Sequence, residues 1–453
     1  MNRSLKISSL ALVLSFAASA QVSPAISSWL QNSTITGSYY MQGNSTALSN
    51  GILVNCQQVS YTSTAVYVEA TGVPAYATGP FLDGNPSQAS NQNGIFEFPL
   101  SPMPNTGTPS ATTPGNIGIF INGVALFDYR DGVGWNSSTN ALCGGPGNPP
   151  CPNMQSDWNR DAIPAEMAGF DCSKGHPAMG NYHHHQNPSA FDLDLSVVSN
   201  ICNLYDADGL YVIDSTQHSP LLGFAYDGYP IYGAYGFANT DGSGGVKRIR
   251  SGYHLRAISQ RTHYANGTNV DDGPAVDATY FLGYFREDYE FIDSTSSYPY
   301  FLDEHNGRFC VTPEYPNGTY AYFCTVDEDW NSAYPYAIGP TFYGVLSGGS
   351  VNAVPAGATV YNSSIGTNKQ ALPELHVFPN PASELLTIQA KGLVAGAISI
   401  KLKDASGRLV ATKTIQAGQT IGFFNTETLY EGIYFLEISD GENHHQEKII
   451  IEH

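Results

Sequence analysis

The segment IGIFINGVALFDY, residues 117–129, indicates the fold more directly than any other stretch of the chain. Its β-forming residues flank Asn122-Gly123, a pair favoured in two-residue hairpin turns because both turn positions require positive φ. The segment LLGFAYDGYPIYGAY, residues 221–235, has the same arrangement around Asp227-Gly228. Residues 51–70 are also rich in strand-forming residues. We therefore predict a chain built mainly from strands and hairpins.

The composition supports a mostly β fold with long loops. Only 13% of the 453 residues are charged, whereas Gly (46), Tyr (29) and Pro (28) are abundant. Tyr is common in strands, and Gly and Pro favour turns over helices. Turn-forming residues fill the long segments 79–94 and 102–115. A chain of this length is expected to form two domains or more, and we predict a β-rich α+β large domain with little helix.

The first twenty residues have the pattern of a signal peptide. Basic Arg3 and Lys6 precede an apolar run from Leu10 to Ala17, and small residues follow up to Ala20. We expect cleavage after Ala20 and export of the mature chain. The apolar run is shorter than the roughly 20 residues needed to cross a bilayer, so no transmembrane segment is expected.

A change of composition near residue 354 predicts a second domain. Residues 354–373 are small, polar and weakly patterned, as in a linker. From 374 to 453, alternating apolar and polar residues, as in AISIKLKD and GIYFLEISDG, predict strands joined by turns. A segment of roughly 75–80 residues suits a small immunoglobulin-like β-sandwich. The large domain would then span residues 21–353.

The formal net charge of −20 limits the classes of partner. Nucleic acids and anionic membrane surfaces repel an acidic protein, so neither is expected to bind. The same charge favours solubility and is compatible with divalent cations. A small-molecule or glycan ligand stays open, because composition does not identify one.

The cysteines predict a disulfide framework, as is usual in exported proteins. Spacing suggests three pairs, although it does not determine connectivity. The candidate pairs are Cys143–Cys151 around a Gly/Pro loop, Cys172–Cys202 around a histidine-rich segment, and Cys310–Cys324 across a hairpin. The seventh cysteine, Cys56, is then free or paired outside this scheme.

The segment GHPAMGNYHHHQNP, residues 175–188, holds four of the 12 histidines. Side chains alternate along a strand, so His183 and His185 would share one face and His184 the other. His176 could fold back toward them across the intervening Pro/Gly turn. Histidine is the commonest metal ligand and titrates near neutral pH, which favours a metal site or catalysis. The alternative is a polar core in which these histidines bond Tyr hydroxyls and backbone carbonyls.

A metal site needs more ligands than one strand can supply. Besides His183, His185 and His176, His218 is our fourth candidate, because it begins the next conspicuous motif. The cysteine spacings do not match zinc-binding thiolate motifs. Imidazoles without thiolate suit a divalent transition metal such as Zn, Cu or Fe, and the sequence does not choose among them.

Three neighbouring residues and one carboxylate elsewhere are candidate catalytic groups. Asp303, Glu304 and His305 lie together in LDEHNGR, residues 302–308, and could act as a base with its partner. They could equally form a salt-bridged turn. Asp227 could orient an imidazole or simply make the turn before Gly228.

The C-terminal segment resembles the type IX secretion sorting domain of Bacteroidetes. The residues that carry the resemblance are Phe378-Pro379-Asn380-Pro381, the turn Asp404–Arg408, the strand start Gly432-Ile433-Tyr434 and the last strand at 447–452. The resemblance implies that the type IX machinery engages residues 374–453 and exports the protein to the medium or the outer-membrane surface.

Residues 24–350 resemble the YHYH family, an exported group of poorly known function. The motifs are the histidine segment at 175–188, HSPLLGFAYDGYPIYGAYG at 218–236, GYFREDYEF at 283–291, and the LDEHNGR segment with the Tyr-rich stretches that follow it up to residue 344. The name-giving motif alternates Tyr and His, whereas this chain has His184 at the third position. The pair His183 and His185 is retained, and the opposite face changes.

Together these features predict an exported protein whose large domain has a histidine-centred site. Our leading hypothesis is a metal-dependent site on the strand at 182–186, whose metal an enzyme would use to activate water or oxygen. A non-catalytic module that binds a metal or a glycan is the second hypothesis. A purely structural surface protein with histidines in its core is the third.

Overall fold

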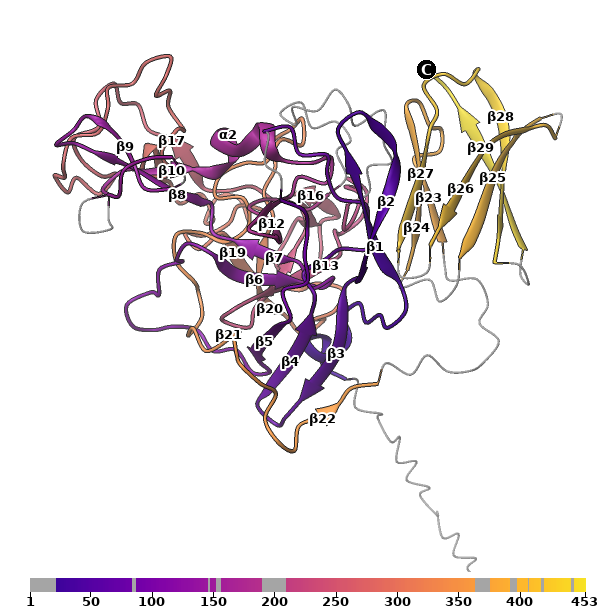
Figure 1. Ribbon diagram of the computed structural model, residues 1–453, viewed down its shortest axis with the longest axis horizontal. Coiled ribbons are helices and arrows are strands. Elements are labelled where there is room, and N and C mark those ends of the chain that lie inside the picture. Colours follow the sequence, from indigo (N-terminus) through magenta and orange to yellow (C-terminus); the bar gives the residue numbers. More distant parts are fainter. Residues whose placement is uncertain are drawn as a thin grey trace, which may run out of the picture.

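The computed structural model describes residues 22–83, 87–145, 147–151, 156–189, 209–362, 375–391, 397–405, 407–416, 419–440 and 444–453. The expected signal peptide, Cys202 and most of the expected linker lie outside the described residues. Figure 1 shows a large β-rich body and, beside it, a small β-sandwich formed by the C-terminal residues. The predicted mostly β fold class is confirmed.

An eight-stranded sheet forms the centre of the large body, in the order β11-β12-β7-β6-β13-β14-β20-β19. The pairs β12–β7 and β14–β20 are parallel, and the other neighbouring pairs are antiparallel. The strands are β11 (His176–Ala178), β12 (Asn181–His184), β7 (Ala125–Phe127), β6 (Asn116–Phe120), β13 (Leu221–Ala225), β14 (Pro230–Tyr232), β20 (Thr319–Phe323) and β19 (Gly307–Cys310).

Both predicted hairpins lie in the middle of this sheet. β6 pairs with β7 across the turn that contains Asn122-Gly123, and β13 pairs with β14 across Asp227-Gly228. Gly123 has a φ of 77° and Gly228 a φ of 89°, which glycine adopts without steric cost. At Gly123 a Cβ atom would also lie 2.6 Å from the Cβ of Ala70. Glycine is therefore needed there both for the turn and for the contact between sheets.

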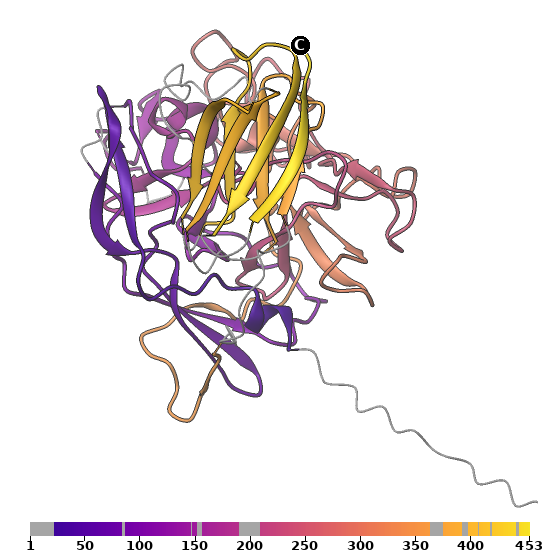
Figure 2. The same cartoon turned by 90° about the vertical axis from the view of Figure 1, so that its right-hand side faces the viewer.

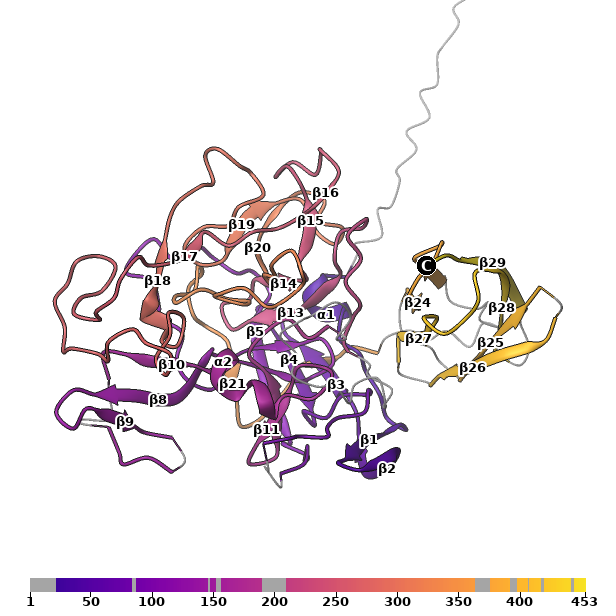
Figure 3. The ribbon, with the colours of Figure 1, turned by 90° about the horizontal axis from the view of Figure 1, so that it is seen from above.

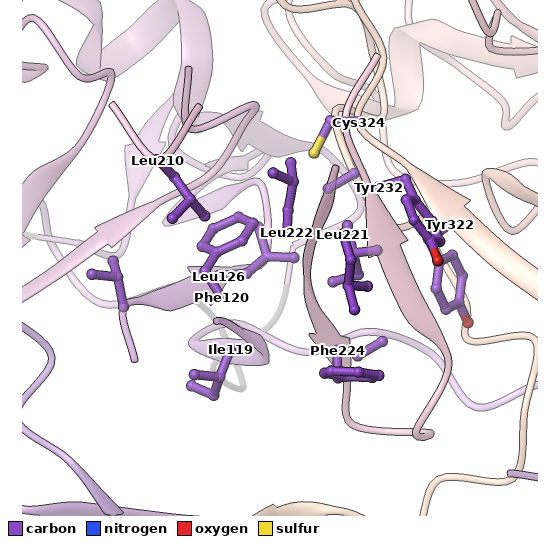
Figure 4. Packing of buried hydrophobic residues seen from close by; sticks show 14 of the residues in the cluster. Ile119, Phe120, Leu126, Leu210, Leu221, Leu222, Phe224, Tyr232, Tyr322 and Cys324 are labelled. Carbon is purple, nitrogen blue, oxygen red and sulfur yellow. The ribbon is translucent and has the colours of Figure 1, made fainter. Parts of the chain in front are cut away.

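A second, five-stranded sheet packs against the first. Its order is β21 (Gly349–Ser350), β5 (Gly94–Pro99), β4 (Ala65–Ala70), β3 (Cys56–Tyr61) and β22 (Thr359–Val360). The Trp29 ring lies 5.2 Å from Phe98 of β5 and 5.5 Å from Phe224 of β13, so it joins the two sheets. Figure 4 shows the apolar side chains of β6, β7, β13 and β14 within this buried cluster.

Shorter elements surround these two sheets. The small sheets are β1 (Thr36–Met41) with β2 (Asn44–Leu53), β10 (Asn159–Asp161) with β8 (Arg130–Asn136) and β9 (Ala141–Cys143), β15 (Tyr235–Phe237) with β16 (Val246–Arg248), and β17 (Tyr253–Leu255) with β18 (Tyr289–Phe291). The helices are α1 (Pro24–Ser27), α2 (Ala162–Glu166), and the 3₁₀ turns η2 (Met167–Gly169) and η4 (Arg286–Asp288). Figure 3 shows β8, β9, β10, β17 and β18 together at the end farthest from the C-terminal body.

The C-terminal body is the predicted β-sandwich, seen face-on in Figure 2. One sheet contains β23 (Leu375–Phe378), β24 (Leu385–Ala390) and β27 (Ile421–Asn425); the other contains β26 (Leu409–Ile415), β25 (Ile398–Asp404), β28 (Gly432–Ser439) and β29 (His444–Ile451). Alternate residues such as Ile400, Leu402, Leu436 and Ile438 form a core of its own. Ile421 instead joins the core of the large body, so the two bodies are in contact. The boundaries at 353 and 374 stay a prediction.

The cysteines agree only in part with the expected framework. Cys143 and Cys151 form a disulfide, and Cys172 is also disulfide-bonded, although its expected partner lies outside the described residues. The expected Cys310–Cys324 bond is wrong, because both thiols are free and buried. Cys310 pairs in register with Thr319, which places Cys324 five residues farther along the partner strand. At about 3.4 Å per residue this separation far exceeds the roughly 7 Å limit between bridged Cα atoms.

Cys56 is free and fully buried, and burial raises its pKa well above the ordinary value. Such a thiol stays protonated and acts as a small apolar side chain. Within the described ranges, no helix has both the length and the apolar character that crossing a membrane requires.

The close contact between β6 and β13 makes the first testable prediction. A Cβ at Gly223 would lie 2.4 Å from the carbonyl oxygen of Ile119, and backbone cannot move aside as a side chain can. We expect Gly223→Ala to lower the free energy of unfolding by about 1–3 kcal/mol or more. Gly107→Ala is the control, because its nearest atom is 3.4 Å away. Equal denaturant unfolding curves for the two variants would contradict this packing.

Candidate metal centre

A hairpin formed by β11 and β12 positions the histidines. Ala178 pairs with Asn181, so Met179-Gly180 form a two-residue turn with φ values of 49° and 87°. Positive φ at both positions is typical of the type I′ turn that suits the twist of paired strands. The hairpin register places His176 directly opposite His183. His176 therefore folds back onto the histidine run, as the Pro/Gly turn suggested.

The three consecutive histidines alternate between the two faces of β12, as predicted. The Nε2 atoms of His183 and His185 are 3.1 Å apart. On the other face, His184 Nδ1 lies 3.0 Å from the Lys174 carbonyl, which can only accept a hydrogen bond, so this nitrogen is the donor. His184 Nε2 then accepts from the Tyr76 hydroxyl at 2.8 Å. His184 thus has both ring nitrogens satisfied and is a core residue.

Three histidines converge on one point. The ligand atoms of His176, His183 and His185 all lie within 4.8 Å of one another, and all three side chains are buried. Among the described residues, this is the cluster of histidines, cysteines and carboxylates that converges closely enough to hold a metal ion. The His176 Nε2 atom is buried and makes no well-aligned hydrogen bond, although the Glu166 carboxylate lies 3.3 Å away. A buried nitrogen without a well-aligned partner is costly, so His176 Nε2 is a candidate metal ligand.

Backbone carbonyls orient two of the three rings. His183 Nδ1 donates to the Asn181 carbonyl at 2.8 Å, and His185 Nδ1 donates to the Asp128 carbonyl at 2.6 Å. Each Nδ1 therefore carries the proton, and each neutral ring presents a lone pair at Nε2. Two lone pairs 3.1 Å apart repel unless a cation lies between them or one ring gains a proton. Carbonyl-anchored imidazoles of this kind are usual in metal sites.

Glu166 completes the cluster and was missed by sequence analysis. It ends the short helix α2, which begins where the Asp161 carboxylate accepts a hydrogen bond from the Ile163 N–H at 2.9 Å. Its Oε2 atom lies 3.3 Å from His176 Nε2 and 3.3 Å from His185 Nε2. The signal available in the sequence was one carboxylate within an otherwise apolar run, AIPAEMAGF at 162–170.

The electrostatics of the cluster favour an anionic Glu166, a neutral His183 and a proton on His185. Burial, with the positive charges of His185 and His176, lowers the pKa of His183 well below its ordinary value. Burial alone would raise the pKa of Glu166, but hydrogen bonds with His176 and His185 outweigh it and lower that pKa. Burial alone would lower the pKa of His185, but its hydrogen bond with Glu166 and the negative charge of that carboxylate outweigh burial and raise the pKa. A metal bound at His185 Nε2 would displace the proton held there.

Aromatic rings enclose the cluster. Phe127 stacks on His183 with ring centroids 3.7 Å apart, and Phe170 makes an edge contact with His176 at 4.9 Å. These contacts hold the imidazoles in place and limit the access of water. Glu166 is the least enclosed member, with 27% of its side chain exposed.

The spacing suits a first-row transition metal. Ligands bound at about 2.0–2.1 Å in a tetrahedron lie about 3.3 Å from one another. The observed separations of 3.1 Å and 3.3 Å are close to that value. His185, with His183 and Glu166 at these distances, could therefore bind Zn, Cu or Fe. The ligand atom of His176 lies within 4.8 Å of those of His183 and His185 and could complete the site.

His218, the fourth expected ligand, lies elsewhere. Its ring packs against Tyr232 at 5.2 Å and Phe237 at 4.8 Å, and its Nδ1 bonds the Ser219 carbonyl. Burial lowers its pKa to about 4. The expectation failed because His218 precedes β13, and the β7–β6 pair separates that strand from β12 in the sheet.

Asp227 was expected either to orient an imidazole or to make the turn before Gly228. In the structure it makes the turn. Its carboxylate accepts hydrogen bonds from the Tyr322 hydroxyl at 2.6 Å and the Gly344 N–H at 2.8 Å. Burial raises its pKa to about 6, and these bonds oppose the shift. The carboxylate thus stabilises the β13–β14 turn and the loop that covers it.

The LDEHNGR residues are at the other end of the sheet, next to β19. Asp303 accepts from the Tyr320 hydroxyl at 2.8 Å and from the His305 and Gly307 N–H groups, so it caps the turn. His305 bonds Thr341, and Glu304 is 63% exposed. In strand order β19 and β11 are opposite edges. The alternative of a capped turn describes these residues better than a catalytic cluster.

Comparison with known protein families matches residues 95–334 to the family described as "YHYH protein", which is more than half of the chain. Residues 376–452 match the "Secretion system C-terminal sorting domain". No curated protein matches. Among solved structures, the chain is similar to a β-glucosidase from Listeria innocua in complex with glucose. Identity is 16%, the TM-score is 0.13, and the match covers 18% of this chain and 16% of that one, so it carries no argument.

The contrast between His184 and its neighbours makes a second prediction. Tyr76→Phe removes the donor to His184 Nε2 and leaves that nitrogen buried without a partner. We expect a loss of about 1–3 kcal/mol in the free energy of unfolding. The affinity of the three converging histidines for a metal ion should stay unchanged. Tyr298→Phe is the control, since Tyr298 is 50% exposed. A loss of metal affinity in Tyr76→Phe would show that His184 belongs to the site.

Proposed function

The chain belongs to the YHYH protein family, and we propose that its large domain binds one divalent transition metal through His176, His183, His185 and Glu166. The observation that carries this proposal is the pair of carbonyl-anchored imidazoles whose Nε2 atoms face each other at 3.1 Å. A bound cation would replace the proton on His185 that otherwise offsets the repulsion between their lone pairs. It also gives the buried His176 Nε2 atom a partner.

The C-terminal domain determines where this site works. Its sorting-domain sequence directs export by the type IX pathway to the cell surface or the medium.

The donor set restricts the metal. Three imidazoles and one carboxylate suit Zn, Cu or Fe, whereas Mg and Ca prefer oxygen ligands alone. The free thiols Cys56, Cys310 and Cys324 are not members of the group. We therefore expect no thiolate ligand and no tight binding of the hard cations.

The surroundings of the proposed metal fit a catalytic role better than a purely structural one. Structural zinc sites are closed on all sides, whereas catalytic sites keep one position accessible. Here Glu166 is partly exposed, and it contacts only two of the three imidazoles. A divalent metal held here would supply Lewis-acid or redox chemistry. The chain's part is to orient the imidazoles, exclude bulk water through Phe127 and Phe170, and hold one negative charge at Glu166.

The alternative is an extracellular module that binds a metal without catalysis. The burial of the histidines favours this reading, because three of the four donors are shielded from solvent. Substrate turnover separates the two functions, and metal content alone does not.

Metal analysis is the direct test of the proposal. We expect the untagged mature protein to contain close to one transition-metal ion per chain, and the double variant His183→Ala/His185→Ala to contain none. The variant His218→Ala should keep its metal, since that ring bonds Ser219 and not the cluster. The measurement is elemental analysis after dialysis, with circular dichroism to verify folding. A metal-free wild type, after reconstitution with Zn²⁺, Cu²⁺ and Fe²⁺, would overturn the proposal.

The role of Glu166 makes a further prediction. Glu166→Gln keeps the shape of the side chain and removes its negative charge. We expect the metal dissociation constant to rise by about 10–100-fold, as for other changes in the ligand environment. Glu304→Gln is the matched control, because Glu304 is exposed and outside the cluster. Competition with a chromophoric chelator measures both, and an equal affinity in the two variants would remove Glu166 from the ligand set.

A further inference from the structure

A pocket of about 180 Å³ shares the Phe170 side chain with the surroundings of the histidine cluster, and none of the four proposed ligands lines it. Met167 and Gln186 line it, and they directly follow Glu166 and His185 in the chain. The Phe170 ring forms part of its wall, and the same ring lies 4.9 Å from the His176 ring and 6.3 Å from the His185 ring. One aromatic side chain thus contacts both the pocket and the ligand cluster.

The lining of the pocket combines apolar and polar surface and carries no charged side chain. Ile163, Pro164, Phe170 and Leu282 contribute aliphatic and aromatic surface. Phe281, at its rim, is 44% exposed, so the pocket reaches the surface. A site of this kind admits apolar groups and rejects ions, because nothing in its wall would offset the loss of hydration.

A few polar groups give the pocket one hydrogen-bonding corner. Gln186 Oε1 accepts from the Ser332 hydroxyl at 2.6 Å, and both residues line the pocket. Because that bond uses the amide oxygen, the Gln186 amide nitrogen stays available as a donor among the described residues. A small number of placed polar groups in an apolar wall is typical of ligand sites.

Tyr336 adds a separate observation. Its φ is 71°, which is rare for a bulky residue and costs free energy unless the surroundings enforce it. Its ring lines the pocket, and its hydroxyl donates to the buried Asp161 carboxylate at 2.7 Å. The same carboxylate caps helix α2, which ends at Glu166. The strained residue therefore links the pocket wall to the helix that positions a proposed ligand.

We propose that this pocket binds the substrate of the metal centre, and that the substrate presents one uncharged, phenol-like ring to it. The proposal rests on the metal site proposed above. It adds the substrate class, which is a small neutral aromatic compound, or a larger one that ends in such a ring. In this arrangement Phe170 and Gln186 determine specificity, because both would contact the aromatic ring of the substrate. Phe170 packs against the proposed ligand His176, and Gln186 follows the proposed ligand His185 in the chain.

The size and charge of the pocket support this class. A dry cavity of about 150 Å³ holds one benzene-sized molecule, and the pocket here is slightly larger. No Lys, Arg or His lines the pocket, so an anionic ring would lose its hydration there without an ion pair in the wall. Cationic rings would also bind poorly, because no carboxylate lines the pocket. A neutral ring with one hydroxyl can pack against the apolar side chains and form a hydrogen bond with the polar groups Gln186 and Ser332.

The probe for this proposal is 4-fluorophenol, observed by ¹⁹F NMR with the full mature protein loaded with Zn²⁺ or with Co²⁺. We expect saturable binding with a roughly millimolar or lower dissociation constant, as small ligands of this size reach. We expect 4-fluorobenzoate and 4-fluorobenzylamine to bind at least about tenfold more weakly. In the Co²⁺ protein the bound fluorine should relax faster than in the Zn²⁺ protein, because the ring lies near the metal.

A pocket-filling variant tests where the probe binds. Leu282→Trp places a larger ring in the pocket and should weaken 4-fluorophenol binding about tenfold or more, with metal content unchanged. Leu346→Trp is the matched control, since Leu346 is 44% exposed and does not line the pocket. Equal binding to both variants would overturn the proposal, as would preference for the benzoate or no Co²⁺ effect on a bound probe.

The outcomes separate this proposal from the metal site itself. A protein that holds its metal but does not bind 4-fluorophenol keeps the proposed metal centre and loses the proposed substrate class. A protein without metal loses the proposed metal centre, and with it the assignment of the pocket as that centre's substrate site, whether or not the ring binds.

Discussion

Two backbone carbonyl groups determine the chemistry of the histidine cluster. The carbonyls of Asn181 and Asp128 accept hydrogen bonds from the Nδ1 atoms of His183 and His185, so that the two Nε2 atoms face each other at 3.1 Å. The Asp128 carbonyl is in position because β12 pairs in parallel with β7, the strand that ends one residue before it. The hairpin with β11 then adds His176 on the same side. The central sheet therefore sets the tautomer and direction of the rings before any ligand binds.

Burial turns this geometry into a strong constraint. Lone pairs and a carboxylate that are shielded from water lose their hydration, and they must recover the lost free energy from partners inside the protein. Glu166 supplies a negative charge, and the imidazoles supply hydrogen bonds that lower its pKa. A divalent cation would satisfy all four groups at once. The neighbouring pocket shares the Phe170 ring with this cluster, so the binding of a ring and the position of the imidazoles would be coupled.

The sequence predicted the elements that local rules control. The Asn122-Gly123 and Asp227-Gly228 hairpins, the alternation of the histidines on β12 and the C-terminal sandwich follow from turn preferences and strand periodicity. Glu166 was not predicted, because a short helix brings it to the histidines through tertiary packing alone. His218 was expected at the site only because of its place in the chain.

The cysteines show the same limit. Cys143–Cys151 spans a short loop, so spacing alone was enough to find it. Cys310 and Cys324 bracket a real hairpin, but the strand register pairs Cys310 with Thr319 and leaves Cys324 beyond the end of β20. Side-chain partners across a sheet depend on register, which the spacing of two cysteines does not reveal.

The central claim is that one metal ion binds to the Nε2 atoms of His176, His183 and His185 and to Glu166. The most direct measurement is a crystal structure of the metal-loaded protein with anomalous difference maps recorded on both sides of the metal's absorption edge. The account predicts a single strong peak about 2.0–2.2 Å from those three nitrogens and from a Glu166 oxygen. A metal peak elsewhere, or no peak while the three rings keep the positions described here, would contradict it.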